Sequence, residues 1–232
     1  STASIQVIVE AERRAYADRA AHLGDPDFWK VPQSTLLSDA YIAERMKDYD
    51  ATKASASKDV QAGTVHESEE TTHISIMDED GNMVAVTTTL NDSYGSKTVV
   101  GGAGFILNDE MDDFSIKPGV PNMYGAIGGE ANAIAPGKRM LSSMTPTLVL
   151  KNNKPFIVVG TPGGTTIPTS VFQSIINVID FGMSATDAVN KQKFHHQWLP
   201  DIVFTENNFS AETAQHLQAM GYKIEKRGNI GR

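Results

Sequence analysis

The sequence predicts an α+β protein in which short β-hairpins and helices occupy separate layers. Two stretches, 73–90 and 147–159, show the alternation of apolar residues that is typical of antiparallel hairpins. Helical spacing of apolar residues is found at 4–23, 39–47, 169–180 and 211–220. Because the strands come as consecutive hairpins rather than as alternating strand–helix units, this order favours α+β layering over a doubly wound parallel sheet.

Composition and charge exclude several classes of protein. The 232 residues can bury a sizeable core, and a hydrophobic content of 40% is ordinary for a globular protein. The net charge of −8 argues against nucleic acid and against anionic membrane surfaces as partners. The lack of Cys excludes disulfides, thiolate metal sites and cysteine nucleophiles. No apolar run approaches the length of a membrane span.

The first 50 residues predict two helices. The first helix, over 4–23, should end before Gly24 and bury one apolar face, with Glu12 and Arg19 as exceptions. That face holds Ile5, Ile8, Val9, Tyr16, Ala20 and Leu23. Ser38 should cap the second helix, which presents Tyr41, Ile42 and Met46. No strand precedes residue 73, so these helices either pack on the later sheet or end a domain that lies elsewhere.

Residues 51–70 predict an exposed, mobile loop that ends against a strand. Val60 and Val65 are its only branched aliphatic residues, too little apolar surface to offset the entropy of ordering. Thr71 follows and opens a core strand. An autoprocessing enzyme would be cut here, because a free α-amine on Thr71 can serve as the base for its own hydroxyl. The alternative is that Thr71 is an ordinary strand residue.

The middle and end of the chain predict short elements around long loops. We expect a strand at 105–107, a carboxylate-rich turn at 108–113 and a lid or binding loop at 118–139. Asn152-Asn153 should form the turn of the second hairpin. Gly182 should end the helix over 169–180. A capping box at 184–187 and strands at 202–204 and 222–225 complete the pattern.

Several groups of residues have two interpretations. Gly163 and Gly164 follow an apolar strand and precede a helix, so they suit either an oxyanion hole or a tight turn. A set of polar residues at strand ends and in loops could bind a zwitterion, although each alone also fits a solvated loop residue or a cap. The set is Thr89, Asn91, Glu110, Asp113, Ser142 and Ser143. His195-His196 has no third His at ligand spacing, so we expect no metal site.

Six stretches together resemble the γ-glutamyltransferase (γ-glutamyl transpeptidase) family of N-terminal-nucleophile hydrolases. They are GDPDF (24–28), TTHISIMDEDGNMVAVTTTLN (71–91), GAGFILNDEMDDFSIKPGVPN (102–122), KRMLSSMTPT (138–147), VVGTPGG (158–164) and FHHQWLPD (194–201). The resemblance covers nearly the whole chain and implies an αββα sandwich. It also implies a precursor that cleaves itself between Glu70 and Thr71.

The resemblance implies a role for each matching residue and no cofactor. Thr71 would attack the γ-glutamyl amide and form an acyl-enzyme, which water, an amino acid or a peptide then resolves. Thr89 would orient Thr71, and Gly163 and Gly164 would supply the oxyanion-hole N–H groups. The substrate's α-ammonium would meet Asn91, Glu110 and Asp113, and its α-carboxylate would meet Ser142 and Ser143. Tyr124 would be the gate of the lid.

The resemblance also implies a division of the chain and its partners. Residues 1–50 would end the large subunit, 51–70 would form the loop before the cut, and 71–232 would form most of the small subunit. The family's chains are longer at both ends, and an arginine for the α-carboxylate lies in the part before residue 1. We therefore expect a piece of a larger precursor that matures to a heterodimer, is inactive alone, and is periplasmic or secreted. The substrates would be glutathione and related γ-glutamyl compounds.

Two other functions remain open at this stage. The first is a relative that acts on cephalosporin or glutaryl side chains or on poly-γ-glutamate. The second is a glutamate-binding homologue that never matures. The paired Ser142 and Ser143 favour the ordinary enzyme, and the presence of Thr71, Thr89 and Gly163-Gly164 argues against a non-catalytic scaffold.

Overall fold

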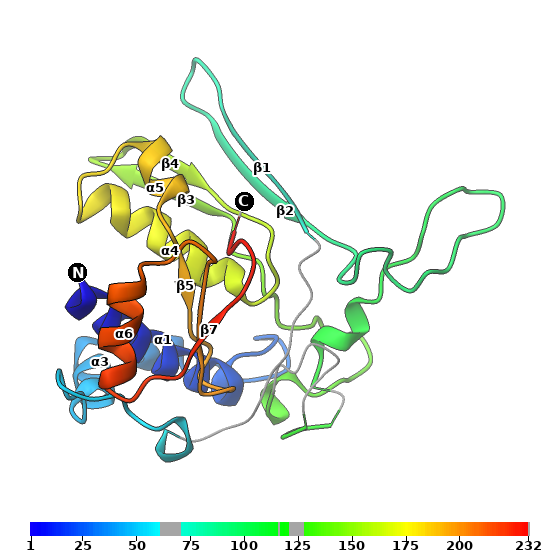
Figure 1. Cartoon of the computed structure of the whole chain (residues 1–232). Coiled ribbons are helices and arrows are strands. Elements are labelled where there is room, and N and C mark those ends of the chain that lie inside the picture. Colours follow the sequence, from blue (N-terminus) through cyan, green and yellow to red (C-terminus); the bar gives the residue numbers. More distant parts are fainter. Residues whose placement is uncertain (61–70, 116, 121–127, 232) are drawn as a thin grey trace. The chain divides into compact units, whose positions relative to one another are not determined.

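The structure is a computed structural model, and it describes residues 1–60, 71–115, 117–120 and 128–231 (Figure 1). The chain divides into two compact units. The first unit comprises Ser1–His66, Met111–Leu141 and His195–Arg227, and the second comprises Glu67–Glu110, Ser142–Phe194 and Gly228–Arg232. The cleavage-site residue Glu70 and the predicted gate Tyr124 fall outside the described residues. None of the described helices is long and apolar enough to cross a membrane.

The first unit is built on a long N-terminal helix and a small sheet. Its helices are α1 (Thr2–His22), α2 (Gln33–Leu36), α3 (Asp39–Met46) and α6 (Ala211–Ala219), with 3₁₀ turns at Ser57–Asp59 and Glu130–Asn132. Its three-stranded sheet has the order β5-β6-β7, from Phe194–His195, Val203–Thr205 and Ile224–Lys226. The strands β6 and β7 are parallel and are joined through α6. The predicted helices at 4–23, 39–47 and 211–220 are thus confirmed, and Ser38 caps α3 as predicted.

The buried face of α1 is charged, which the apolar spacing of its residues did not predict. Glu10, Arg13 and Arg14 are among its most buried side chains, whereas Ile5 and Ile8 are only half-buried. Burying charges is costly unless each one is paired and hydrogen-bonded. Arg14 meets the carboxylates of Glu10 at 2.6 Å and Asp48 at 2.7 Å. The helix is therefore fixed by an ion-pair network as well as by apolar contacts.

A second buried group surrounds the His195-His196 pair. Trp198 packs with Ala17, Ala20 and Val60, and its backbone N–H donates to Nδ1 of His196 at 3.0 Å. His196 therefore carries its proton on Nε2, which faces Asp201 at 3.4 Å. His195 contacts Gln197 through Nε2. The ring nitrogens of His195 and His196 thus contact buried groups of the first unit itself.

The second unit is formed by two hairpins and two helices. The hairpins are β1–β2 (Thr72–Met77, Met83–Thr88) and β3–β4 (Thr147–Lys151, Lys154–Val159), and β4 contacts both strands of the first hairpin. The helices are α4 (Thr166–Ile179) and α5 (Ala185–Asn190), the latter capped by Ser184 as predicted. Asn152 and Asn153 both have positive φ, 52° and 58°, which is the backbone of a tight type I′ hairpin turn.

The hairpin β1–β2 leaves one apolar face open, contrary to the prediction of a core strand. Ile74 pairs with Val86 and Ile76 with Val84 across the strands, so the four side chains share one face. They are 45–54% exposed. On the opposite face, Met83, Ala85 and Thr87 of β2 and His73 of β1 are half-buried, whereas Ser75 and Met77 are exposed. The pattern predicted the hairpin correctly but not the extent of its burial.

The predicted strand at 105–107 is reduced to one isolated bridge, Val99 to Ile106. Val100 donates to the carbonyl of Phe105 at 2.9 Å, and the chain between them turns through Gly102 and Gly104 at positive φ. Glycines in this conformation end a strand ladder after a single pair. The carboxylate-rich turn is confirmed, with a 3₁₀ helix over Glu110–Asp113.

The buried histidines should make the first unit sensitive to mild acid. Burial lowers the pKa of His196 to about 4 and that of His195 to about 3, against 6.5 for an ordinary His. Between these values and 6.5 the unfolded chain binds more protons, so their contribution to stability is complete above pH 6.5 and is lost as the pH falls. We expect the free energy of unfolding in urea to drop by about 1–3 kcal/mol from pH 7.5 to pH 5.

The matched variants are His196→Asn, whose amide oxygen can still accept from the Trp198 N–H, and His216→Asn on the exposed face of α6. His196→Asn should remove roughly half of the pH dependence, whereas His216→Asn should leave it intact. If the free energy of unfolding of His196→Asn depends on pH as strongly as that of the wild type, then burial of this histidine is not the cause of the pH dependence.

Candidate active site

Thr71 and Thr89 adjoin the open end of the hairpin β1–β2. The register pairs Thr72 with Thr88 and His73 with Thr87, and one further step of the same register would set Thr71 against Thr89, just outside the paired strands. Directly opposed residues of an antiparallel pair have Cβ atoms about 4.5–5.5 Å apart. Residues 71 and 73 also share one face of the strand, because side chains alternate. The predicted nucleophile and its predicted orienting hydroxyl therefore both lie next to the open end of this hairpin.

Asn91 and Glu110 lie beside this end of the hairpin. The backbone N–H of Asn91 donates to Oγ1 of Thr89 at 3.0 Å, and Asn91 has a φ of 73° that turns the chain away from the strand. Its side-chain amide donates to the carbonyl of Asp109 at 3.4 Å, and the Asp109 N–H donates to the carbonyl of Leu90 at 3.1 Å. These bonds bring the segment before Glu110 against the segment after Thr89.

His73 connects β1, the strand that follows Thr71, to the glycine loop at 160–164. Its ring hydrogen-bonds Thr87 through Nδ1 and Ser75 through Nε2, both at 2.8 Å. A Cβ on Gly160 would stand 2.1 Å from Cε1 of this ring, so the imidazole occupies the space that a side chain at 160 would need. Partial burial lowers the pKa of His73, which keeps the ring neutral. No role for His73 was predicted from the sequence, although it is the third residue of the TTH motif.

Gly163 and Gly164 form the entry to α4. Both have positive φ, 137° and 57°, and their carbonyls accept from the N–H groups of Thr166 and Ile167 at 3.1 Å. A Cβ on Gly163 would meet Oγ1 of Thr166 at 2.6 Å. The backbone therefore requires glycine at 163, and it lies at the N-terminus of a 14-residue helix, where partial positive charge favours an oxyanion.

The remaining predicted residues are spread over both units. Ser142 and Ser143 precede β3 in the second unit, and Oγ of Ser142 accepts from the Met144 N–H at 3.0 Å. Asp113 belongs to the first unit, where its carbonyl accepts from the side-chain amide of Asn132 at 2.7 Å. The second unit thus contains Thr71, Thr89, Asn91, Glu110, Ser142, Ser143 and the 160–164 loop, whereas Asp113 belongs to the first unit.

An ion pair in the first unit joins two of the family-like stretches. Arg139 donates to the Asp25 carboxylate from its backbone N–H at 2.8 Å, from Nε at 3.0 Å and from Nη2 at 2.6 Å. These hydrogen bonds lower the pKa of Asp25. Arg139 comes three residues before Ser142 in the sequence, so this pair anchors the start of the segment that carries both serines.

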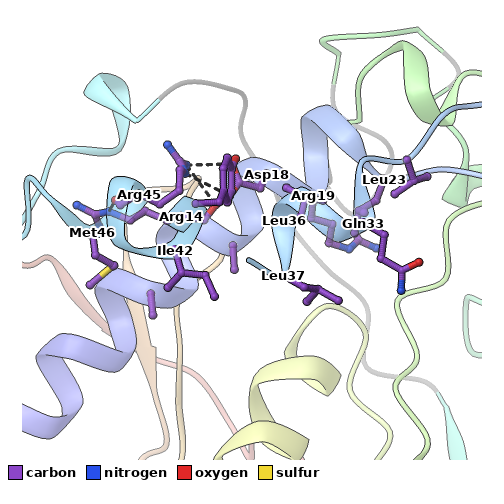
Figure 2. Close-up of a pocket in the computed structure, with 14 residues that line it drawn as sticks. Arg14, Asp18, Arg19, Leu23, Gln33, Leu36, Leu37, Ile42, Arg45 and Met46 are labelled. Carbon is purple, nitrogen blue, oxygen red and sulfur yellow. Dashed lines mark hydrogen bonds and ion pairs between the residues drawn. The ribbon is translucent and has the colours of Figure 1, made fainter. Parts of the chain in front are cut away.

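A cavity in the first unit lies among α1, α2 and α3 and contains none of the predicted site residues (Figure 2). Its volume is about 520 Å³, and its walls are mainly apolar. Arg45 and Asp18 form an ion pair of 3.1 Å at its edge. The cavity and the candidate active site are therefore separate features.

An α+β fold with a threonine at the open end of a hairpin and a glycine loop entering a helix is the arrangement of the N-terminal-nucleophile hydrolases. The comparisons confirm this fold class. The family model for γ-glutamyltranspeptidase matches residues 1–232, and the chain belongs to that family.

The relatives include both hydrolases and acylases. The glutathione hydrolase proenzyme of Escherichia coli is 48% identical over 100% of this chain and 40% of its own length. A crystal structure of an alanine mutant of Helicobacter pylori γ-glutamyltranspeptidase is 55% identical, with a TM-score of 0.67 over 69% of this chain and 87% of that one. A cephalosporin acylase from Bacillus halodurans is 26% identical, with a TM-score of 0.81 over 100% of this chain and 40% of that one. The chain spans about two fifths of the length of the curated relatives it matches.

The contact between His73 and Gly160 can be tested by filling the space. Gly160→Ala should displace the ring and lower the free energy of unfolding by about 1–3 kcal/mol, the usual cost of overpacking. Removing the ring in the double variant Gly160→Ala/His73→Ala should recover part of that loss. Urea denaturation of the single and double variants measures both effects.

Gly101→Ala is the matched control, because a Cβ there would meet nothing within 4 Å and the backbone has no positive φ. It should leave stability unchanged. If the loss of stability in the double variant equals the sum of the losses in Gly160→Ala and His73→Ala, then the two side chains do not compete for the same space.

Proposed function

We propose that the complete protein is a γ-glutamyl transpeptidase and hydrolase that cleaves the γ-glutamyl amide of glutathione and related compounds. The observation that supports the proposal is the hairpin β1–β2, whose open end adjoins Thr71 and Thr89 and whose His73 lies against the loop that leads to Gly163. Membership of the family and the names of the relatives, glutathione hydrolase proenzymes, support the substrate.

The proposed reaction begins with cleavage of the precursor between Glu70 and Thr71. The new α-amine of Thr71 takes the proton of its own hydroxyl as Oγ attacks the γ-carbonyl. The N–H groups of Gly163 and Gly164 stabilise the oxyanion of the tetrahedral intermediate. Its collapse breaks the C–N bond, the leaving amine takes the proton, and a γ-glutamyl ester on Thr71 remains. Water or the amine of an amino acid or peptide then attacks this ester, which breaks its C–O bond, returns a proton to Oγ of Thr71 and releases glutamate or a new γ-glutamyl amide.

The proposed binding residues divide by charge. Asn91, Glu110 and Asp113 hold the substrate's ammonium, Ser142 and Ser143 hold its carboxylate, and Tyr124 gates the pocket. A carboxylate suits an ammonium and hydroxyls suit a carboxylate, because each then forms charge-assisted hydrogen bonds. We also propose a heterodimer, with residues 1–50 and the loop 51–70 in the larger fragment and 71–232 in the smaller. The name proenzyme in the relatives supports processing.

The matched shares of the chains agree with this division. The H. pylori enzyme matches 69% of this chain, and residues 71–232 are 162 of the 232 residues, or about 70%. A separate small chain that starts at Thr71 would have about this length. We propose export to the periplasm or the medium from the family resemblance alone, and cell fractionation of the full-length protein tests it.

Replacing Thr71 should separate the enzyme from an inert scaffold. In the full-length precursor, Thr71→Ala should abolish cleavage and lower turnover of a γ-glutamyl anilide by at least about a thousandfold. Thr71→Ser keeps a hydroxyl and should still be cut. The measurement is intact mass after incubation at neutral pH, followed by the assay.

The control is Thr72→Ser at the first residue of β1, which is exposed and should change neither result. A wild-type precursor that stays uncut would refute the proposal and leave the non-maturing binding homologue.

A second candidate function is that of an acylase for cephalosporin or glutaryl side chains. It is favoured by the match of the B. halodurans acylase to 100% of this chain. Both functions use the same nucleophile and differ in the acyl group. A γ-glutamyl donor carries an α-ammonium and an α-carboxylate, whereas a glutaryl group carries only the carboxylate.

The full-length, cleaved protein should therefore turn over a γ-glutamyl anilide at least tenfold faster than glutaryl-cephalosporin, and Glu110→Gln should reduce only the former. Turnover is compared as kcat/KM. The reverse preference would assign the protein to the acylases.

A further inference from the structure

Residues on both sides of the predicted cut are interlocked in the first unit. Trp198 lies after the cut, and its indole N–H donates to the carbonyl of Ser57 at 3.2 Å and to that of Val60. Trp198 is 1% exposed and packs with Ala17, Ala20 and Val60, which all lie before the cut. Val60 is the last described residue before Thr71.

Asp201 holds the same segment through a different group. Its Oδ2 accepts from the backbone N–H of Ser57 at 2.8 Å, and its Oδ1 is paired with the guanidinium of Arg13. His196 faces Oδ1 at 3.4 Å. Three donors thus converge on one carboxylate, and two of its partners, Ser57 and Arg13, precede the cut. Arg13 is 1% exposed, so the loss of the carboxylate would leave a buried charge short of its partner.

Further hydrogen bonds also join residues before the predicted cut to residues after it. The hydroxyl of Tyr222 donates to Glu10 at 2.7 Å, the N–H of Ala54 donates to the carbonyl of Met220 at 2.7 Å, and the N–H of His196 donates to Glu12 at 2.9 Å. At Ser57 and Val60, the hydrogen bonds from Trp198 and Asp201 are with the backbone, one N–H and two carbonyls, and the Val60 side chain packs in the same cluster as Trp198. Recognition of this segment therefore depends on its path more than on its side chains.

We propose that Trp198 and Asp201 form a clamp that grips the backbone of Ser57–Val60 and holds the end of the larger fragment after cleavage. The partner of this surface is the tail of the protein's own N-terminal fragment. The proposal rests on the cleavage proposed above. Before the cut the two parts are one chain, and after it this clamp and its neighbouring bonds oppose their separation.

The test uses the full-length precursor with Trp198→Phe, which keeps an aromatic ring but loses the N–H donor, and Asp201→Asn, which keeps the shape but loses the charge. Both variants should be cleaved at the same bond. Their fragments should then separate in urea with an apparent dissociation constant at least tenfold above wild type, measured by size exclusion and by mass of the separated fragments. Trp29→Phe, at the other tryptophan, is the matched control, since Trp29 is partly exposed and lies outside the clamp.

Hydrogen exchange of the Ser57 amide gives a second measurement that needs no cleavage. The amide should exchange at least tenfold faster in Asp201→Asn than in wild type, because its acceptor has lost its charge. If the wild-type precursor is not cut, the proposed function fails and the clamp is judged on this exchange alone. Fragments that stay together as firmly as those of Trp29→Phe, or unchanged exchange at Ser57, would overturn the clamp.

Discussion

The charges buried on α1 determine how the first unit is assembled. Glu10 is fully buried, and its carboxylate accepts from Arg14, Tyr222 and the backbone of Ser55. A buried charge that lacks its partner costs several kcal/mol, so the segments that supply these partners must be in place together. The network therefore joins three segments of the first unit: α1, the loop at Ser55 and the segment at Tyr222. These segments should fold cooperatively.

In the second unit, the packing of β1 against β4 depends on the lack of a side chain at Gly160. The ring of His73 lies where a Cβ on Gly160 would be, and β4 can approach β1 this closely only because residue 160 is glycine. One short contact thus ties the strand that begins next to Thr71 to the loop that ends at Gly164. The geometry proposed for catalysis depends on packing within this unit rather than on any single hydrogen bond.

Local patterns in the sequence were sufficient for most elements. The Asn152-Asn153 turn, the Ser38 and Ser184 caps and the glycine after α4 were each predicted from chemistry within a few residues, and each is confirmed. The predictions failed where the outcome depends on distant residues. Apolar spacing placed Ile5 and Ile8 in the core, but pairing with residues near 48 and 201 turned the charged side of α1 inward.

In the candidate active site, too, contacts between residues distant in the sequence were not predicted. The motifs TTH and PGG indicated Thr71 and the glycine pair, whereas the contact of His73 with Gly160 joins residues 87 positions apart and has no local signal. The roles of Asn91, Asp113, Ser142 and Ser143 stay predictions, because they concern a bound substrate. The division of the chain at Thr71 also stays a prediction.

The open aliphatic face of β1–β2 has a consequence for how the protein is produced. A hairpin of neighbouring residues forms within about 1–10 μs, well before contacts between distant parts of a chain. The new polypeptide therefore displays Ile74, Ile76, Val84 and Val86 early, in a strand pair whose edges can accept another strand. Association with a second chain rises with concentration, whereas folding does not. Recovery of the folded protein should therefore fall as its concentration during synthesis rises.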